Sequence, residues 1–279
     1  MSLQVIGDPV LHSKSPVIHG AMLGLLGLDI DYTAHVVRRG ELPQYLAWAR
    51  ENGVIGFNAT MPHKEDLLPL LDKIDPAAEI VGAVNTVCLR DGKWVGFNTD
   101  GAGAVAALKD GLSVDPAGLT VTLLGAGGAA KAVALALSQA GAERVFVCNR
   151  TLARAQELCA HDPLGRLAPA GFDPDTLCRM AGQSRLLVNC TNLGMEGCPH
   201  QFDDFSFLDA LPPDAGVFDL IYHPAETELL SQARRRGLKT LNGLPMLVWQ
   251  AVLALEHFLN RPLDRGEMAG AATAAIAEH

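Results

Sequence analysis

A run of apolar residues that ends in closely spaced glycines constrains this chain more than any other feature. The segment LTVTLLGAGGAAKA (119–132) places Gly125, Gly127 and Ala130 in a G-x-G-x-x-A spacing, and a helix-like pattern follows it. The first glycine of such a turn permits a tight bend, and the second lets backbone N–H groups approach a pyrophosphate. The third small residue lets helix and strand pack closely. The spacing and its context predict a strand, turn and helix that bind a dinucleotide.

The next strand-like run, ERVFVCNR (143–150), indicates which dinucleotide. A site for NAD needs Asp or Glu near the end of this strand to bond the ribose hydroxyls. This chain instead has Asn149, Arg150 and Thr151, followed by Arg154. A guanidinium pairs with the 2′-phosphate of NADP, which a carboxylate would repel. Arg150 could also be a polar residue at the start of a helix, but its place beside the glycine turn favours NADP.

Composition excludes several classes of protein. Of 279 residues, 49% are hydrophobic and 19% charged, which indicates a folded chain of one or two domains. The net charge of −9 argues against sequence-independent binding to nucleic acid. The six cysteines form no C-x-x-C pair and no His-rich cluster, so neither a metal site nor a disulfide framework is expected. Without a leader pattern or a long apolar run, we expect a cytoplasmic protein that does not bind membranes.

Short apolar runs alternate with longer helix-like segments along the whole chain, which is typical of α/β proteins. Strands are expected near 3–9, 31–37, 54–60, 119–128, 143–150, 185–191, 215–222 and 238–243, and a hairpin over 83–100 turns at Asp91-Gly92. A change in pattern near residue 101 predicts two domains, with the C-terminal helix returning to the first. We therefore expect one domain from residues 1–101 and 242–279, and a second from residues 102–241.

Four polar segments in the first hundred residues each follow an apolar strand, where α/β proteins place ligand groups. They are HSKSP (12–16), NATMPHK (58–64), VNT (84–86) and FNTDGAG (97–103). Most of their polar residues are uncharged hydrogen-bonding groups that suit a polyhydroxylated ligand, with Lys64 and Asp100 as an evident charged pair. Taken singly, each has a simpler explanation: the serines as helix caps, Asn85 and Asp100 as turn formers, and Lys64 as a solvated helix residue.

Together these segments resemble the shikimate dehydrogenase family. The likeness extends over essentially the whole chain, through HSKSP, NATMPHK, VNT, NTDG, GAGGA, NRT, YHPAETELL (222–230) and GLPMLVWQ (243–250) in the family's order. It implies an α/β substrate domain with a mixed sheet, completed by the C-terminal helices, and a Rossmann-type domain that binds NADP. It also implies a soluble enzyme, monomeric or homodimeric, whose small-molecule partners are shikimate and 3-dehydroshikimate.

The resemblance also implies roles for individual residues. Lys64 and Asp100 correspond to the catalytic pair, and no metal is implied. The residues that correspond to substrate-binding positions are Ser13, Ser15, Thr60, Asn85, Tyr222 and Gln250. Those that correspond to cofactor contacts are Gly125, Ala126, Gly127, Gly128, Ala129, Ala130, Asn149, Arg150, Thr151, Arg154, Gly243 and Met246. The chain departs from the family pattern at Gly20, Ala59, Asn192 and Pro245, and these departures affect the expected substrate preference and the loop on the nicotinamide side.

The implied reaction is the reversible, NADPH-dependent reduction of 3-dehydroshikimate to shikimate in aromatic amino acid biosynthesis. Reduction of a ketone needs a hydride at carbon and a proton at the developing alkoxide, which a lysine ammonium can supply. Three alternatives stay open: a quinate or broader-specificity dehydrogenase, a non-catalytic paralogue that senses a ligand, and a folate dehydrogenase with similar domains. The serine-rich HSKSP segment and NRT favour shikimate over a pteridine, which needs an aromatic or acidic clamp.

Overall fold

The computed structural model describes residues 1–278 and divides them into two compact units. The first contains Met1–Thr99 and the described residues from Val248 onward, and the second contains Asp100–Leu247. The sequence pattern placed the two changes of domain at residues 101 and 242. The longest helix, α10 (Leu244–Leu259), begins in the second unit and continues into the first.

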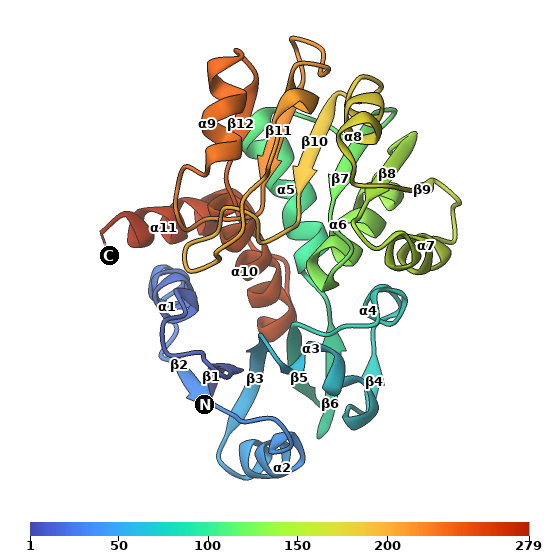
Figure 1. The fold of residues 1–279 in the computed structure, drawn as a ribbon. Coiled ribbons are helices and arrows are strands. Elements are labelled where there is room, and N and C mark those ends of the chain that lie inside the picture. Colours follow the sequence, from blue (N-terminus) through green and yellow to red (C-terminus); the bar gives the residue numbers. More distant parts are fainter. Residues whose placement is uncertain (279) are drawn as a thin grey trace. The chain divides into compact units, whose positions relative to one another are not determined.

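The first unit is built on a mixed six-stranded sheet in the order β2-β1-β3-β5-β6-β4 (Figure 1). Five of its strands run in the same direction, and only β5 runs antiparallel to them, between β3 and β6. The strands are β1 (Ser2–Gly7), β2 (Asp31–Val36), β3 (Val54–Ala59), β4 (Lys73–Ile74), β5 (Thr86–Arg90) and β6 (Lys93–Phe97). The expected hairpin is confirmed: Arg90 pairs with Lys93, and Asp91 and Gly92 have φ of 51° and 73°, as a two-residue turn requires.

The helices of the first unit cover this sheet with apolar side chains. They are α1 (Ser15–Leu25), α2 (Leu42–Glu51), α3 (His63–Asp66), α4 (Pro76–Val81), the greater part of α10, and α11 (Arg265–Ala277). Tyr45 of α2 belongs to a buried cluster that also includes Phe57 and Trp94 of the sheet, and α1 packs against α11. Gly56 lies so close to Phe258 of α10 that an added Cβ would be 2.6 Å from that ring. The return of α10 to the first sheet therefore depends on a glycine.

The second unit contains a six-stranded sheet, entirely parallel, in the order β12-β11-β10-β7-β8-β9 (Figure 1). Numbered along the unit, this is the order 6-5-4-1-2-3 of a doubly wound dinucleotide-binding domain. The strands are β7 (Thr120–Leu124), β8 (Arg144–Cys148), β9 (Leu167–Ala170), β10 (Leu186–Asn189), β11 (Gly216–Asp219) and β12 (Lys239–Leu241). The strand order reverses between β7 and β10, and ligands of such sheets bind beyond the carboxyl ends at this reversal. The expected α/β fold is confirmed.

The helices of the second unit connect these strands. They are α5 (Asp100–Leu112), α6 (Gly128–Gln139), α7 (Leu152–Ala160), α8 (Pro174–Ala181) and α9 (Glu228–Arg235). Gly101 lets α5 and α6 approach closely, because a Cβ there would lie 2.4 Å from the carbonyl oxygen of Ala132. No helix within residues 1–278 is long and apolar enough to cross a membrane.

Candidate active site

The HSKSP segment forms the loop after β1 and the first turn of α1. Ser13 accepts a hydrogen bond at Oγ from the backbone N–H of Ser15 at 3.2 Å, which closes a turn just before the helix, whose N-cap residue, Lys14, makes no side-chain capping bond. Ser15 is 7% exposed, and its side chain lies beside the phenol of Tyr32. The two serines thus differ: Ser13 closes the turn that leads into the helix, whereas Ser15 lies beside a buried polar chain.

That chain continues through Asn58 at the end of β3. The Tyr32 hydroxyl donates to Asn58 Oδ1 at 2.7 Å, and Asn58 Nδ2 donates to the carbonyl of Asn85 at 3.1 Å and to Thr86 Oγ1 at 3.0 Å. Asn58 is only 6% exposed, and these bonds use both of its amide protons and its oxygen. The sequence pattern predicts that Asn58 binds a ligand. In the structure, its side chain is instead bonded to neighbouring residues and holds them in place.

Asn85 lies just before β5 and is 2% exposed. Its Oδ1 accepts from the backbone N–H of Thr99 at 2.9 Å, and its Nδ2 donates to Thr99 Oγ1 at 3.0 Å. Its carbonyl also accepts from the N–H of Ala59 at 2.9 Å. Asn85 therefore fixes the end of β3 and the end of the first unit at Thr99.

Lys64 and Thr60 lie in the segment that leaves β3. Thr60 donates its N–H to the carbonyl of Ile6, and its Cγ2 would be 2.5 Å from a Cβ at Gly7, so β1 must carry a glycine there. Lys64 is half-buried in the one-turn helix α3, and its carbonyl accepts from the N–H of Val84 at 2.7 Å. The first unit therefore brings Ser15, Thr60, Lys64 and Asn85 together through backbone bonds and the Asn58 network.

Three further predicted site residues are Gln250, Asp100 and Tyr222. Gln250 is half-buried in the second turn of α10, in the part that belongs to the first unit. Asp100 is the first residue of α5 and of the second unit, and it is 8% exposed. Tyr222 follows β11 and is 42% exposed, with its side chain presented at the surface of the second unit.

The glycine turn has the geometry that its spacing predicts. Gly125 has φ of +107°, which favours glycine, and its N–H bonds to the carbonyl of Cys148 at 2.8 Å. Gly127 precedes α6, and a Cβ on Gly127 or Gly128 would meet nothing within 4 Å, so the helix N-terminus is open to a ligand. Ala130 is fully buried, as close packing of helix and strand requires, whereas Ala126 is half-buried and Ala129 exposed.

The NRT segment joins β8 to α7. Asn149 donates its side-chain amide to the carbonyl of Thr151 at 2.9 Å, and Thr151 precedes the first residue of α7. Arg150 and Arg154 are both exposed. Arg150 thus follows the carboxyl end of β8, the strand next to the glycine turn in the sheet, and Arg154 lies in the first turn of α7.

A pocket of about 260 Å³ lies beside Arg150 in the second unit. Its wall combines apolar and aromatic side chains with a guanidinium, two carboxylates, an amide and a histidine, and comprises Arg150, Phe172, Pro174, Leu177, Leu193, His200, Gln201, Phe202, Asp203, Asp204 and Phe207. Phe172 and Phe202 face each other nearly parallel, with their centroids 6.3 Å apart. A flat apolar group attached to an anion suits such a pocket.

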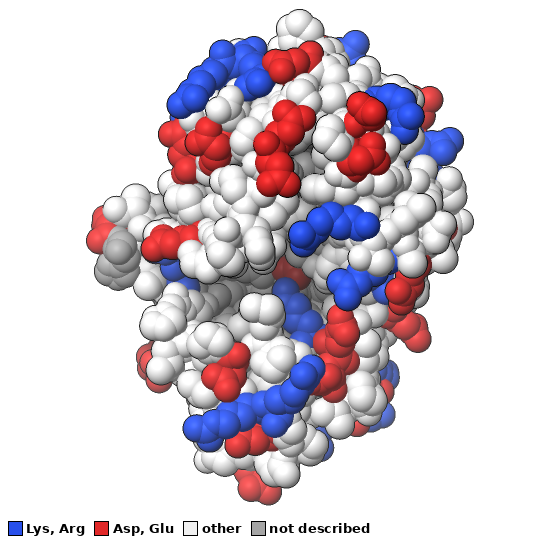
Figure 2. Space-filling view, in the orientation of Figure 1, with Lys and Arg blue, Asp and Glu red and all other residues white. Residues whose placement is uncertain are grey.

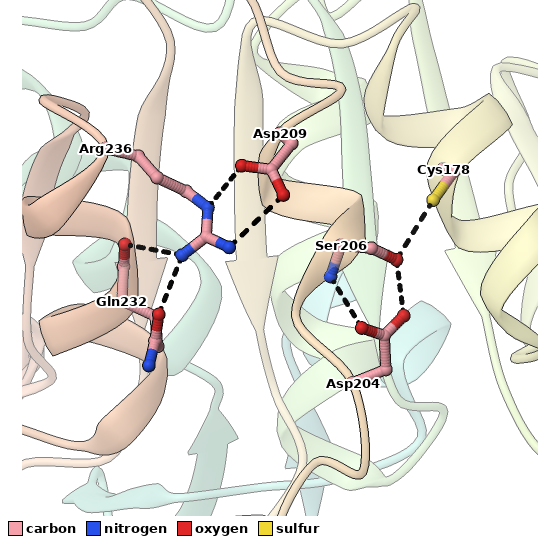
Figure 3. A network of polar contacts seen from close by, with 6 residues as sticks. All are labelled: Cys178, Asp204, Ser206, Asp209, Gln232 and Arg236. Carbon is pink, nitrogen blue, oxygen red and sulfur yellow. Dashed lines mark hydrogen bonds and ion pairs between the residues drawn. The ribbon is translucent and has the colours of Figure 1, made fainter.

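Two sets of polar bonds hold the segment that forms much of this wall (Figure 3). Asp204 accepts from both the N–H and the hydroxyl of Ser206, whose Oγ also lies 3.5 Å from Cys178 Sγ on α8. Asp209 accepts from Arg236 Nε at 2.6 Å and from Nη2 at 3.2 Å. The 204–209 segment is therefore in contact with α8 through Ser206 and is bonded through Asp209 to Arg236, the residue that follows α9.

Gly243 and Met246 lie where β12 leads into α10. A Cβ at Gly243 would be 1.9 Å from the carbonyl oxygen of Leu220, so only glycine fits, and its N–H bonds to the carbonyl of Ile221. Met246 is 9% exposed. Of the departures from the family pattern, Gly20 faces open space on α1 and Asn192 is exposed, whereas Ala59 is buried at the end of β3 and Pro245 is half-buried in the first turn of α10.

Acidic and basic side chains are interspersed over both units on the face drawn in Figure 2. In the most basic run, Arg234–Arg236, two arginines pair with acids, Arg234 with Glu226 at 2.7 Å and Arg236 with Asp209. Within residues 1–278 no group of three or more His, Cys, Asp or Glu residues is placed to hold a metal ion.

Comparison with known proteins identifies the family. Residues 5–87 match the family described as "Shikimate dehydrogenase substrate binding domain", and residues 109–164 match "Shikimate / quinate 5-dehydrogenase". A shikimate dehydrogenase (NADP(+)) from Geobacter sulfurreducens is 39% identical over 278 residues, which cover 98% of this chain and 96% of that protein. The chain belongs to the shikimate dehydrogenase family.

Solved structures of this family have the same fold. Shikimate 5-dehydrogenase from Thermus thermophilus, in complex with NADP(H) and shikimate, aligns with a TM-score of 0.84 at 39% identity and covers 99% of both chains. Quinate dehydrogenase from Corynebacterium glutamicum, in complex with NAD, aligns with a TM-score of 0.85 at 32% identity, over 98% of this chain and 99% of that chain. The resemblance read from the motifs is thus confirmed.

The sequence interpretation did not identify the buried polar residues that hold the predicted site residues in place. Tyr32 and Thr99 in the first unit, and Asn189 and Asp219 in the second, are buried polar residues at the ends of strands. A polar residue within an otherwise apolar run, as in LLVNCT and GVFDLIY, is the available signal, because a buried polar group needs a partner. The identity of that partner depends on the fold.

Proposed function

We propose that this protein is a shikimate dehydrogenase that catalyses the reversible, NADPH-dependent reduction of 3-dehydroshikimate to shikimate, a step of aromatic amino acid biosynthesis. The observation that carries the proposal is near full-length similarity to NADP(+)-dependent shikimate dehydrogenases, one of which binds NADP(H) and shikimate in a solved structure. The protein is accordingly an oxidoreductase that acts on a CH–OH group. We also propose that it works in the cytoplasm as a monomer or homodimer.

The residues of the second unit fit NADP. The open glycine turn at the start of α6 suits the pyrophosphate, because N–H groups and the positive end of the helix point toward it. Arg150 and Arg154 would pair with the 2′-phosphate, since both are exposed, Arg150 just after β8 and Arg154 in the first turn of α7. The pocket beside Arg150 would take the adenine ring. When bound, NADPH supplies the hydride.

Lys64 and Asp100 are proposed as the catalytic pair. The Lys64 ammonium would donate a proton to the alkoxide oxygen as the ketone is reduced, and the amine would take that proton back in the reverse direction. Its positive charge would also stabilise the developing oxyanion. The Asp100 carboxylate would orient the ammonium group. This mechanism does not require a metal ion.

The ring acid is proposed to bind through neutral hydrogen-bonding groups. Ser13 and Ser15 would meet its carboxylate at the start of α1, where the helix dipole adds positive potential. Thr60, Asn85, Tyr222 and Gln250 would meet the remaining oxygen atoms. Asn58 bonds the carbonyl of Asn85 and the phenol of Tyr32, and Ser15 lies beside that phenol.

Quinate is the second candidate substrate, because the matched family description covers shikimate and quinate and a quinate dehydrogenase shares the fold. Purified protein assayed with shikimate and with quinate, each with NADP+ and with NAD+, separates the two. We expect the highest kcat/KM for shikimate with NADP+. A preference for quinate, or for NAD+, would overturn that part of the proposal, and no turnover with any pair would indicate a ligand-binding paralogue.

A further inference from the structure

Asp219 is a fully buried carboxylate at the end of β11 that takes no part in the proposed reaction. Its Oδ1 accepts from Asn189 Nδ2 at 2.9 Å and from the N–H of Ile221 at 3.1 Å, and its Oδ2 accepts from Thr227 Oγ1 at 2.6 Å. Burial raises the pKa of this carboxyl to about 6, although all three hydrogen bonds lower it. Removal of a carboxylate from water costs free energy, so packing alone does not explain the presence of Asp219 at this position.

One arm of the network leads to the glycine turn. Asn189 Oδ1 accepts from both the N–H and the hydroxyl of Thr191, at 3.0 and 2.7 Å, and the Thr191 hydroxyl accepts from the N–H of Leu193 at 3.2 Å. Thr191 Cγ2 would lie 3.2 Å from a Cβ at Gly125. The loop after β10 is therefore folded by Asn189 and packs directly against the turn proposed to hold the pyrophosphate.

The other arm leads to the segment that carries Tyr222. The N–H that Asp219 fixes belongs to Ile221, the residue before Tyr222, and the carbonyl of Ile221 accepts from the N–H of Gly243 at 3.0 Å. The N–H of Leu220 also donates to the carbonyl of Asn189 at 2.9 Å, which joins the two arms. One carboxylate thus holds two loops at the carboxyl edge of the parallel sheet.

We propose that Asp219 is a positioning residue that sets the affinity for NADP through Asn189 and Thr191 and the placement of Tyr222 through Ile221. The inference rests on the proposed function for the identity of the ligands. An amide at this position would keep the shape of the side chain but would offer one acceptor oxygen in place of two. It could not accept from all three donors in the same way.

The test compares Asp219→Asn with a matched control, Asp162→Asn. Asp162 is another buried carboxylate of the second unit, bonded by Ser138 Oγ at 2.8 Å and by the N–H groups of Arg166 and Leu167 at 2.6 and 3.1 Å, but it lies before β9, at the opposite ends of the strands. Calorimetric titration of each full-length variant with NADP+, below its unfolding temperature, measures Kd. We expect Asp219→Asn to weaken binding about tenfold, equivalent to about 1.4 kcal/mol, and Asp162→Asn to leave Kd within about twofold of wild type.

A double-mutant cycle tests the route. Thr191→Val removes the hydroxyl that Asn189 binds while Asp219 keeps its own partners. If Asp219 acts through Asn189 and Thr191, the Kd of the double variant for NADP+ is close to that of the single variant that binds NADP+ less tightly. If the two residues act independently, the fold increases in Kd of the two single variants multiply. An unchanged Kd in Asp219→Asn, or an effect equalled by Asp162→Asn, overturns the inference. Should Asp219→Asn fail to fold, Thr191→Val alone must weaken binding. Wild-type protein that binds no NADP+ contradicts the proposed function instead.

Steady-state kinetics test the second arm. Asp219→Asn should raise the KM for shikimate while kcat changes less, because Tyr222 is proposed to bind substrate and takes no part in proton transfer. A loss of kcat with an unchanged KM would contradict the placement of Tyr222 by Asp219.

Discussion

Asn58 shows how a polar residue within a binding motif can serve a site without meeting the ligand. Its sequence context, at the end of an apolar strand, resembles that of Thr60 and Lys64, yet all of its hydrogen-bonding protons go to neighbouring residues. Sequence patterns identify the segment that forms a site, because strand ends meet at one edge of a sheet. They do not distinguish the residues that bind the ligand from the residues that hold those binding residues in place.

Arg150 is proposed to determine which cofactor is bound. Arg150→Ala removes a charge-assisted contact to the 2′-phosphate, which is worth about 1.5–3 kcal/mol or roughly 10–150-fold in affinity. We expect the KM for NADP+ to rise by such a factor and the KM for NAD+ to change little. Equal losses with both cofactors would mean that Arg150 supports the fold or stacks on adenine instead.

His19 makes the stability of the first unit depend on pH. The imidazole is fully buried and stacked on Tyr32 with centroids 4.2 Å apart, and burial lowers its pKa from 6.5 to about 3, opposed in part by the nearby polar side chain of Asn58. The unfolded chain binds this proton at higher pH than the folded chain does. The contribution of neutral His19 is therefore complete above about pH 6.5, and it falls by about 1.4 kcal/mol per pH unit as the pH drops toward 3.

Urea unfolding of wild type and His19→Phe between pH 7 and pH 4 measures this effect. All three tryptophans, Trp48, Trp94 and Trp249, belong to the first unit, so their fluorescence follows that unit alone. We expect the variant to lose less stability than wild type over this range. Parallel losses would show that His19 does not titrate on unfolding.

The two serines at the start of α1 are expected to differ in the effects of their substitution. Ser13→Ala removes the acceptor for the Ser15 N–H, a single hydrogen bond of the turn before the helix, and should lower the stability of the first unit by about 0.5–1.5 kcal/mol. Ser15→Ala should instead raise the KM for shikimate several-fold to about 100-fold, with a smaller effect on the KM for NADP+, because a hydrogen bond to a charged acceptor is worth up to about 3 kcal/mol. If neither substitution changes the KM for shikimate, its carboxylate is held elsewhere.

The elements that the sequence predicted are those with strong local signals. The glycine turn, the β5–β6 hairpin at Asp91-Gly92 and the apolar strands of the parallel sheet follow from residues next to one another. β4 has only two residues, β9 is LAPA with a proline within it, and α11 is rich in alanine without a clear apolar stripe. These three elements depend on neighbours: β4 on β6, β9 on β8, and α11 on α1. Local patterns could not have predicted them.

In the whole molecule, ring-acid binding is proposed mainly for the first unit and NADP binding for the second. Similarity along the entire chain shows the family, and the roles of individual residues are proposed from the family motifs that they match. Lys64 is the residue on which the proposed chemistry depends most, because it is assigned both the proton and the charge that the alkoxide requires.

The absorbance of NADPH formed from shikimate and NADP+ by wild type and by Lys64→Ala measures both the proposed activity and the part of Lys64 in it. We predict turnover by wild type, and a kcat about 10²–10⁴-fold lower in the variant with a much smaller change in KM, as expected for loss of a positioned acid–base group. Near-normal turnover by Lys64→Ala would remove Lys64 from the chemistry. Absence of NADPH formation by the folded wild-type protein would contradict the proposed activity itself.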